Sequence, residues 1–325
     1  MVFGVIVGAV DLDVATVTRV VLGKIGGSPD DLVPAHVRNI VWELRVPRVA
    51  LAAIVGAGLG VVGVAVQALV RNPLADPYVL GVSSGASIGA ALVMLFGSLA
   101  SLGSAAISVA AFVTASAAMA IVYFVAQERG VLHPMRLVLT GVVLSYVFSA
   151  ITSYLVFRGD PRGAQQVLFW LLGSFGRARW SLLVIPIVVL VPIVGGLLFR
   201  ARQLDALSVG DHAATTLGVG VARLRAELFL ATTALTAVLV AVSGAVGFVG
   251  LVIPHIVRLL VGGAHRRVVP MAAVLGAVFM VWVDIAARTM AAPQEIPLGI
   301  ITAFVGGPLF IALLRHRDRR TRGRI

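Results

Sequence analysis

Long stretches of this chain contain no Asp, Glu, Lys or Arg, and they constrain the fold more than any other feature. A charged side chain at the centre of a bilayer costs about 2.5 to 3.5 kcal/mol, so an uncharged stretch marks a candidate membrane crossing. Only 12% of the 325 residues are charged and mean hydropathy is +1.04, so lipid is the expected solvent and water-soluble enzyme classes are excluded. Four stretches match one spanning helix each: Val49–Val70, Leu137–Phe157, Trp180–Phe199 and Ile296–Leu314.

Three further stretches complete the predicted spans. Pro77–Gln127 is long enough for two helices, with a break near Gly97–Gly103. Leu228–Val257 is too long for one straight helix and too short for two, and its glycines and Pro254 predict a full helix, a bend and a short broken helix. Val268 to about Arg288 supplies another span. We therefore expect an all-α polytopic membrane protein that forms one transmembrane domain over residues 1–325.

The first segment is short for a membrane crossing. Met1–Val10 covers about half a membrane thickness at 1.5 Å per residue, and Asp11 and Asp13 follow it. Three interpretations stay open: a short helix, a helix that continues as Val14–Val21, or a true start upstream. Counting this segment gives about ten transmembrane helices, with both termini on one side.

The net charge of +12 is spread in short clusters between apolar stretches, which excludes a nucleic-acid surface. Positive charge beside spans marks cytoplasmic loops, and the basic tail 315–325 predicts that both termini are cytoplasmic. This orientation places several arginines on the outer face, where the rule disfavours them: Arg45, Arg48, Arg177, Arg179 and Arg288.

Several familiar chemistries lack their residues. The chain has no cysteine, no paired histidine spacing for a metal and no G-x-x-x-x-G-K-[ST] loop, so it does not hydrolyse ATP by itself. Gly58, Gly60 and Gly63 fit a dinucleotide pattern but lie inside an apolar helix. Small-residue spacing predicts close helix packing instead, at Gly56, Gly60, Gly81, Gly85 and Gly89.

Two stretches between spans stand out. Arg71–Pro77 has two prolines and an Asn, and it predicts either a gate of irregular backbone or a plain tight turn. Gln203–Arg225, called the cytoplasmic insert below, predicts a short helix that docks into another protein, or else a solvated linker. In the insert we expect Ser208 and Asp211 as N-caps, Gly218 as a C-terminal stop, and one shared face for Ala213, Ala214 and Leu217.

A third stretch, Gly244–His255, is broken by glycines and Pro254 and has no catalytic constellation. Together with Arg45–Arg48 and Glu295–Gly299, these stretches resemble the FecCD-like permeases of type II ABC importers for iron chelates and cobalamin. The strings RVPR, RNPLADP, LGVSSGAS, GFVGLVIPH and EIPLGIITAFVGGP occur in the family's order, and the resemblance spans about Asp11–Leu314. The family's first helix is usually a full apolar span, and Met1–Val10 departs from that.

The resemblance implies a type II ABC importer permease fold in the plasma (inner) membrane of a bacterium. It also implies a second permease subunit, identical or a sister, two ATPase subunits that hold ATP and Mg²⁺, and an extracytoplasmic binding protein. The chain itself would bind no cofactor or metal and would not be an enzyme. For the cargo we expect a ferric siderophore first, haem second and cobalamin third.

Residue roles follow from the same resemblance. Arg45, Arg48 and Arg288 are similar to outer-face arginines that pair with glutamates of the binding protein, the alternative being contact with lipid headgroups. Asn72 and Leu74 match positions of a cytoplasmic gate, and Ser208–Val219 matches coupling helices that sit in an ATPase groove.

Two rival classes need features that the spans do not supply. An ion-coupled secondary transporter would need carboxylates at mid-span, whereas Asp284 lies close to the end of its span. An intramembrane enzyme would need a nucleophile with a base, or a metal motif, within the helices.

Overall fold

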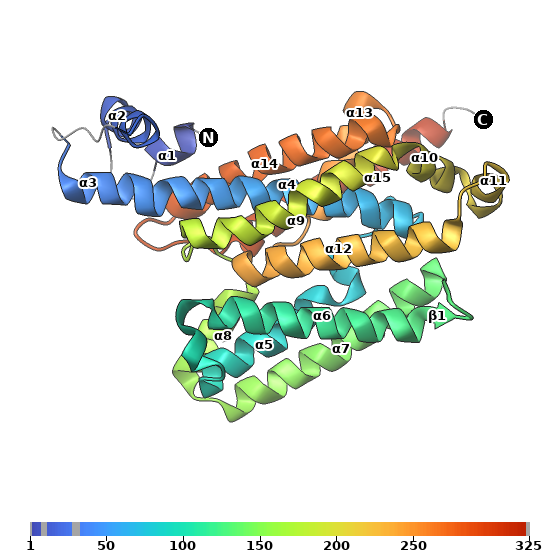
Figure 1. Cartoon of the computed structure of the whole chain (residues 1–325), viewed down its shortest axis with the longest axis horizontal. Coiled ribbons are helices and arrows are strands. Elements are labelled where there is room, and N and C mark those ends of the chain that lie inside the picture. Colours follow the sequence, from blue (N-terminus) through green and yellow to red (C-terminus); the bar gives the residue numbers. More distant parts are fainter. Residues whose placement is uncertain (1, 8–11, 28–32, 323–325) are drawn as a thin grey trace.

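The computed structural model describes residues 2–7, 12–27 and 33–322, and most of these residues are helical (Figure 1). The elements, in chain order, are α1 (Val2–Ile6), α2 (Val14–Ile25), α3 (Ala35–Asn39), η1 (Ile40–Arg45), α4 (Val46–Val70), η2 (Pro77–Leu80), α5 (Val82–Phe96), η3 (Ala100–Ala105), α6 (Ala106–Ala126), β1 (Gln127–Glu128), β2 (Val131–Leu132), α7 (Pro134–Arg158), α8 (Pro161–Leu171), α9 (Trp180–Phe199), α10 (Ala201–Val209), α11 (Asp211–Thr216), α12 (Val221–Ser243), α13 (Val249–Val261), α14 (His265–Thr289) and α15 (Leu298–Arg322). The strands β1 and β2 pair antiparallel as a small hairpin. The expected all-α class is confirmed.

Six described helices are long and apolar enough to cross a membrane: Ala35–Val70, Ala100–Ala126, α7, α9, α12 and α14. Three shorter apolar helices accompany them: α5, α13 and Leu298–Ile311 of α15. The stretch predicted to hold two spans does so, as α5 and α6. The stretch predicted to break does so between α12 and α13.

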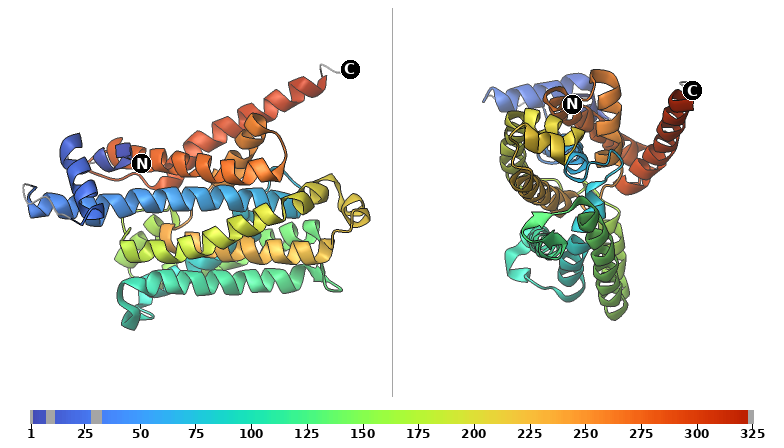
Figure 2. Two further views of the ribbon diagram at one scale, coloured as in Figure 1. Left: turned by 45° about the horizontal axis from the view of Figure 1, so that its top comes forward. Right: turned by 90° about the vertical axis from the view of Figure 1, so that its right-hand side faces the viewer.

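The helices lie roughly along one direction (Figure 1). The insert helices α10 and α11 and the β1–β2 hairpin lie at one end, called the insert end below, and α1–α3 and α8 lie at the opposite end. Viewed along that direction, α5–α8 form a group beside the one built on α4 (Figure 2). α4 runs through the interior, packs against α9, α12, α13 and α14, and is buried along most of its length.

Glycines let α4 approach its neighbours closely. A Cβ at Gly56 would lie 2.1 Å from the carbonyl oxygen of Gly276 in α14, and one at Gly60 would lie 2.5 Å from that of Ala272. The predicted packing role of these two α4 glycines is therefore confirmed, since only glycine permits such contact. Gly81 differs, because it precedes α5 with a φ of 90° and so serves the turn.

The irregular segment between α12 and α13 is hydrogen-bonded to other parts of the chain. The Ser174 N–H donates to the Ser243 carbonyl at 2.9 Å, and the Val246 N–H donates to the Tyr78 hydroxyl at 3.0 Å. Backbone groups freed by a helix break thus find partners within the protein, as a lipid environment requires.

The N-terminal helices are separate. Val7 is not helical and Asp13 is extended, so a single helix from Met1–Val10 through Val14–Val21 is wrong. α1 has five residues, about 7.5 Å of helix, and lies opposite the insert end. α1 is therefore too short to cross the membrane towards the insert end. The basic tail continues α15 as helix to Arg322, towards the insert end (Figure 1).

Candidate functional site

The cytoplasmic insert is held against the bundle by α10. Leu204 and Leu207 of this helix are completely buried. Ser208 lies inside α10, and its hydroxyl donates to the Leu204 carbonyl at 2.9 Å. The prediction that Ser208 caps a helix is therefore wrong, because the helix continues through it and the hydroxyl bonds back one turn.

The second insert helix, α11, begins at Asp211 after Gly210, whose φ of 143° and ψ of 159° suit glycine. Asp211 does not cap α11. Its carboxylate instead accepts two hydrogen bonds from Arg225, at 2.7 and 2.8 Å, so the predicted capping role is wrong. Gly218 does end the helical segment, with a φ of 79° and its N–H bonded to the Thr215 carbonyl.

The exposed apolar side chains of the insert are not the predicted set. Ala214 is completely buried, whereas Leu217 is 71% exposed, so the shared face expected for Ala213, Ala214 and Leu217 is wrong. Val209, at the end of α10, is 77% exposed. The insert therefore presents Val209 and Leu217 outward, while Leu204, Leu207 and Ala214 pack inward.

The predicted gate residues lie in an ordered turn at the insert end. Arg71 ends α4 with a φ of 53°, and the Asn72 N–H donates to the Gln67 carbonyl at 3.1 Å. The Asn72 side-chain oxygen accepts the Leu74 N–H at 2.9 Å. Asn72 and Leu74 are both exposed. Each is thus fixed by local bonds while its side chain faces outward, and the gate itself stays a prediction.

Sequence reasoning missed the groups that connect this turn to α13. The buried Gln67 amide donates to the carbonyls of Gly250 and Leu251 at 3.3 and 3.4 Å, and its oxygen accepts from Arg258. Asp76 caps η2 by accepting the Tyr78 N–H at 2.8 Å. Burial raises the pKa of the Asp76 carboxyl to about 6, although this bond acts to lower it. For Gln67, the available signal in the sequence was a single Gln within an otherwise apolar span.

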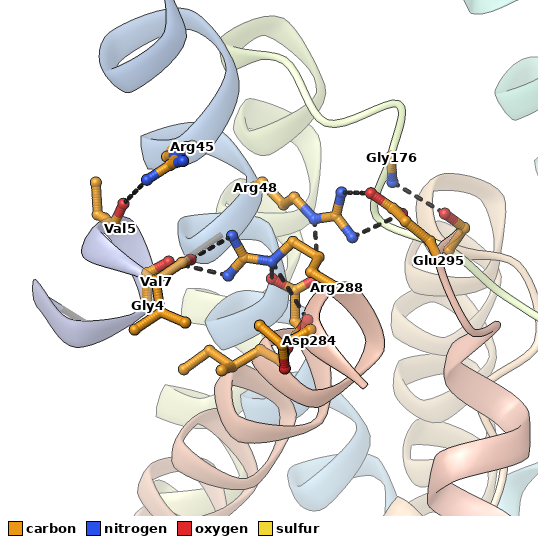
Figure 3. Close-up of polar contacts among 12 residues, drawn as sticks. Gly4, Val5, Val7, Arg45, Arg48, Gly176, Asp284, Arg288 and Glu295 are labelled. Carbon is orange, nitrogen blue, oxygen red and sulfur yellow. Dashed lines mark hydrogen bonds and ion pairs between the residues drawn. The ribbon is translucent and has the colours of Figure 1, made fainter. Parts of the chain in front are cut away.

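At the opposite end, two of the predicted docking arginines bind the first helix (Figure 3). Arg45 donates to the carbonyls of Val5 and Ile6 at 3.1 and 2.8 Å. Arg288 donates to those of Gly4 and Val7, both at 2.9 Å. Arg45 and Arg288 are each 6% exposed. Their guanidinium groups thus satisfy the carbonyls at the end of α1, and a docking role would require α1 to move.

The third arginine belongs to an outer charged cluster of Arg48, Asp284, Arg288 and Glu295 (Figure 3). Arg48 donates to Asp284 at 2.8 Å and to both carboxylate oxygens of Glu295 at 2.6 and 2.9 Å. Arg288 lies 3.1 Å from the other Asp284 oxygen. Asp284 is fully buried, whereas the Glu295 side chain is 45% exposed. Arg48 therefore reaches the surface through Glu295. An acid four residues before Arg288 was the sequence signal for this pairing.

No group of three or more His, Cys, Asp or Glu residues with metal-binding geometry occurs in the described ranges. The described helices form a spanning bundle, with the outer charged cluster at one end and the exposed Val209 and Leu217 at the other. These features define a class: a polytopic helical membrane protein.

The chain belongs to the FecCD transport family, whose model matches residues 1–316. It is 40% identical to the hemin transport system permease protein HmuU of Yersinia pestis, over 86% of this chain and 85% of that protein. It is 39% identical to the Fe(3+) dicitrate transport system permease protein FecD of Escherichia coli, over 85% of each.

A solved structure described as an inward-facing metal-chelate type ABC transporter superposes with a TM-score of 0.79. The two chains are 32% identical, and the superposition covers 93% of this chain and 98% of the chain in the solved structure. The chain is therefore a multi-pass inner-membrane permease of the type II ABC importer fold. It is not an enzyme, because ATP hydrolysis belongs to a separate ATPase.

Proposed function

We propose that this permease moves an iron chelate into the cytoplasm by alternating access, and that a ferric siderophore is the first candidate for this chelate. Membership of the FecCD family supports the importer class. The names of two relatives of nearly equal identity, one for hemin and one for ferric dicitrate, support an iron-containing cargo. Because those two cargoes differ, identity alone does not select the chelate. Haem, and after it cobalamin, are the alternatives.

The observation that carries the coupling role is the outward exposure of Val209 and Leu217 on the insert. Apolar side chains at an aqueous face favour a protein partner, and a short helix laid in a groove is a common way to bind them. We propose that this partner is an ATPase subunit, which holds ATP and Mg²⁺, with one ATPase for each of two permease subunits. The second permease is a second copy or a sister chain.

ATP binding would close the ATPase pair and push the insert, and the helices around Asn72 and Leu74 would rearrange. Energetically, coupling requires that ATP and the loaded binding protein each prefer one of two states, inward-facing or outward-facing. The chain itself makes and breaks no covalent bond in this cycle.

The extracytoplasmic binding protein would dock opposite the insert end. Arg48 can bind a carboxylate of the binding protein there if Glu295 is displaced, because Glu295 is the exposed member of the pair. Arg45 and Arg288 could take part only after α1 has moved, since they bond its carbonyls. Steering of an acidic partner by arginines would mainly speed association.

The test is ATP hydrolysis and uptake in proteoliposomes that hold this permease and its ATPase. The binding protein is added loaded in turn with ferric siderophores, haem and cobalamin. Stimulation by one loaded form identifies the cargo. Changing both Val209 and Leu217 to Asp should abolish co-purification of the ATPase, whereas Thr216→Asp, at an exposed polar site in α11, should preserve it. Uptake that needs an ion gradient and no ATPase would contradict the proposal and support the rival class, an ion-coupled secondary transporter.

A further inference from the structure

Two aspartates of the cytoplasmic insert bond to groups outside their own helices. Asp205 lies in α10 and Asp211 begins α11, on either side of the exposed Val209. Asp211 was predicted to cap a helix within the coupling stretch Ser208–Val219, and Asp205 had no predicted role. Their partners lie in, or at the end of, three different spanning helices, α12, α4 and α14.

Asp211 binds two arginines at once. It accepts a bidentate pair of hydrogen bonds from Arg225, near the start of α12, and its Oδ1 lies 3.5 Å from an Nη of Arg71 at the end of α4. The Arg225 side chain is 3% exposed and the Arg71 side chain is 41% exposed. The buried pair therefore anchors Asp211, while the exposed pair extends the contact to α4.

Arg71 is adjacent in the chain to the predicted gate. It ends α4 in the left-handed region and is followed by Asn72, whose side chain fixes the Leu74 N–H. A displacement of Asp211 thus reaches the turn Arg71–Leu74, called the gate turn below, through the Arg71 side chain and the peptide bond between Arg71 and Asn72.

Asp205 makes the second connection. Its Oδ1 accepts the backbone N–H of His265 at 2.9 Å and lies 2.6 Å from the ring Nδ1 of the same residue. His265 is the first residue of α14, which has no capping bond from its own preceding residue, Ala264. α10 therefore caps α14, a helix that packs closely against α4 through Gly56 and Gly276.

We propose that Asp211, assisted by Asp205, is a positioning residue that transmits movement of the insert to the gate turn and to α14. This inference rests on the proposed coupling role of the insert. It assigns the transmission to two carboxylates rather than to general contact between insert and bundle. A coupled element of this kind must favour different arrangements in the two transport states, so loss of the link leaves ATP use without movement of the gate.

The experiment measures ATP hydrolysis and cargo uptake by the reconstituted complex with its ATPase. Arg71→Gln removes only the exposed link to Asp211 and leaves the buried Asp211–Arg225 pair intact. We expect ATPase activity and co-purification to be retained while cargo taken up per ATP falls by about fivefold, which is the most that an exposed pair is worth. Asp211→Asn should give at least the same fall, because it also removes the counter-charge of the buried Arg225, and Asp211→Glu should restore part of it. The matched control is Arg136→Gln, which breaks an exposed ion pair with Glu128 near the hairpin and should keep the wild-type ratio.

The double variant Arg71→Gln with Asp211→Asn separates one pathway from two. If both residues act on the same link, its uptake per ATP should be no lower than that of Asp211→Asn alone. Uptake per ATP within twofold of wild type in Arg71→Gln would overturn the proposal even if Asp211→Asn failed to fold. Failure of the wild-type permease to bind an ATPase would instead refute the proposed function.

Discussion

Arg48 and Asp284 are 236 residues apart in the sequence and form an ion pair, with 2.8 Å between Nε and Oδ1. The pair joins α4 to α14 at the end opposite the insert. Arg288 shares the same carboxylate from one turn further along α14, at 3.1 Å. One fully buried acid thus balances two arginines, and one of these also holds the carbonyls of α1.

Asp284→Asn should destabilise the protein strongly. The substitution keeps the shape of the side chain but leaves Arg48 and Arg288 without their shared counter-charge. Breaking a buried pair in this way costs about 3–5 kcal/mol. We expect a clearly lower Tm in detergent, measured by thermal unfolding of the purified permease.

The control for this prediction is Glu295→Gln. Glu295 is 45% exposed, and Arg48 keeps Asp284 when it is changed. Exposed pairs are worth about 0–1 kcal/mol, so the Tm should change little. An equal loss of Tm in the two variants would show that burial of Asp284 is not what gives the cluster its strength.

Gly56→Ala should disrupt the contact between α4 and α14. The new Cβ would lie 2.1 Å from the Gly276 carbonyl oxygen, which is helix backbone and cannot rotate away. Overpacking usually costs about 1–3 kcal/mol, and a clash with backbone belongs at or above the upper limit. We expect a reduced yield of monodisperse protein and a lower Tm by fluorescence-detected size exclusion.

Gly195→Ala in α9 provides the comparison. A Cβ there meets no atom within 4 Å, so the change adds only helix propensity, a gain of up to about 1 kcal/mol. Similar losses for the two alanine variants would mean that close approach of backbones does not explain the α4 glycines.

The spans could be predicted because the cost of charge in lipid acts on every residue of a crossing. Uncharged stretches located α7 and α9, and glycine and proline located the break after Ser243. The separation of α1 from α2 was left open, because short polar segments carry little hydropathy signal. Their geometry depends on Arg45 and Arg288, which are distant in sequence.

The functional residues were predicted less well for a physical reason. Motifs identified Arg48 and Asn72, but motifs do not state which groups a side chain contacts. Asp211 is a good capping residue by type, and Arg225 outcompetes the local backbone N–H groups for its carboxylate. Such choices depend on tertiary contacts, which override local preference.

Gln67→Leu should loosen the gate turn and the start of α13. Gln67 is 3% exposed, accepts a hydrogen bond from Arg258, and donates to the carbonyls of Gly250 and Leu251. Leucine would leave Arg258 and the buried Gly250 carbonyl, which cannot bond to Pro254, without this partner, at about 1–3 kcal/mol each. We expect faster hydrogen exchange of the amides in α13. Gln203→Leu, at an exposed site in α10, should leave that exchange unchanged, and protection of α13 in both variants would contradict the role of Gln67.

Asp76→Asn should change how stability depends on pH. Burial raises the pKa of the Asp76 carboxyl from its usual 3.8 to about 6, so the folded protein holds this proton more tightly than the unfolded chain. Its contribution to stability is therefore greatest below about pH 4 and is lost as the pH rises to about 6. Asparagine can still accept the Tyr78 N–H but does not titrate. The Tm of the variant minus that of wild type should rise between pH 4.5 and 7, with the other carboxylates cancelling in the difference, and a constant difference would refute a raised pKa.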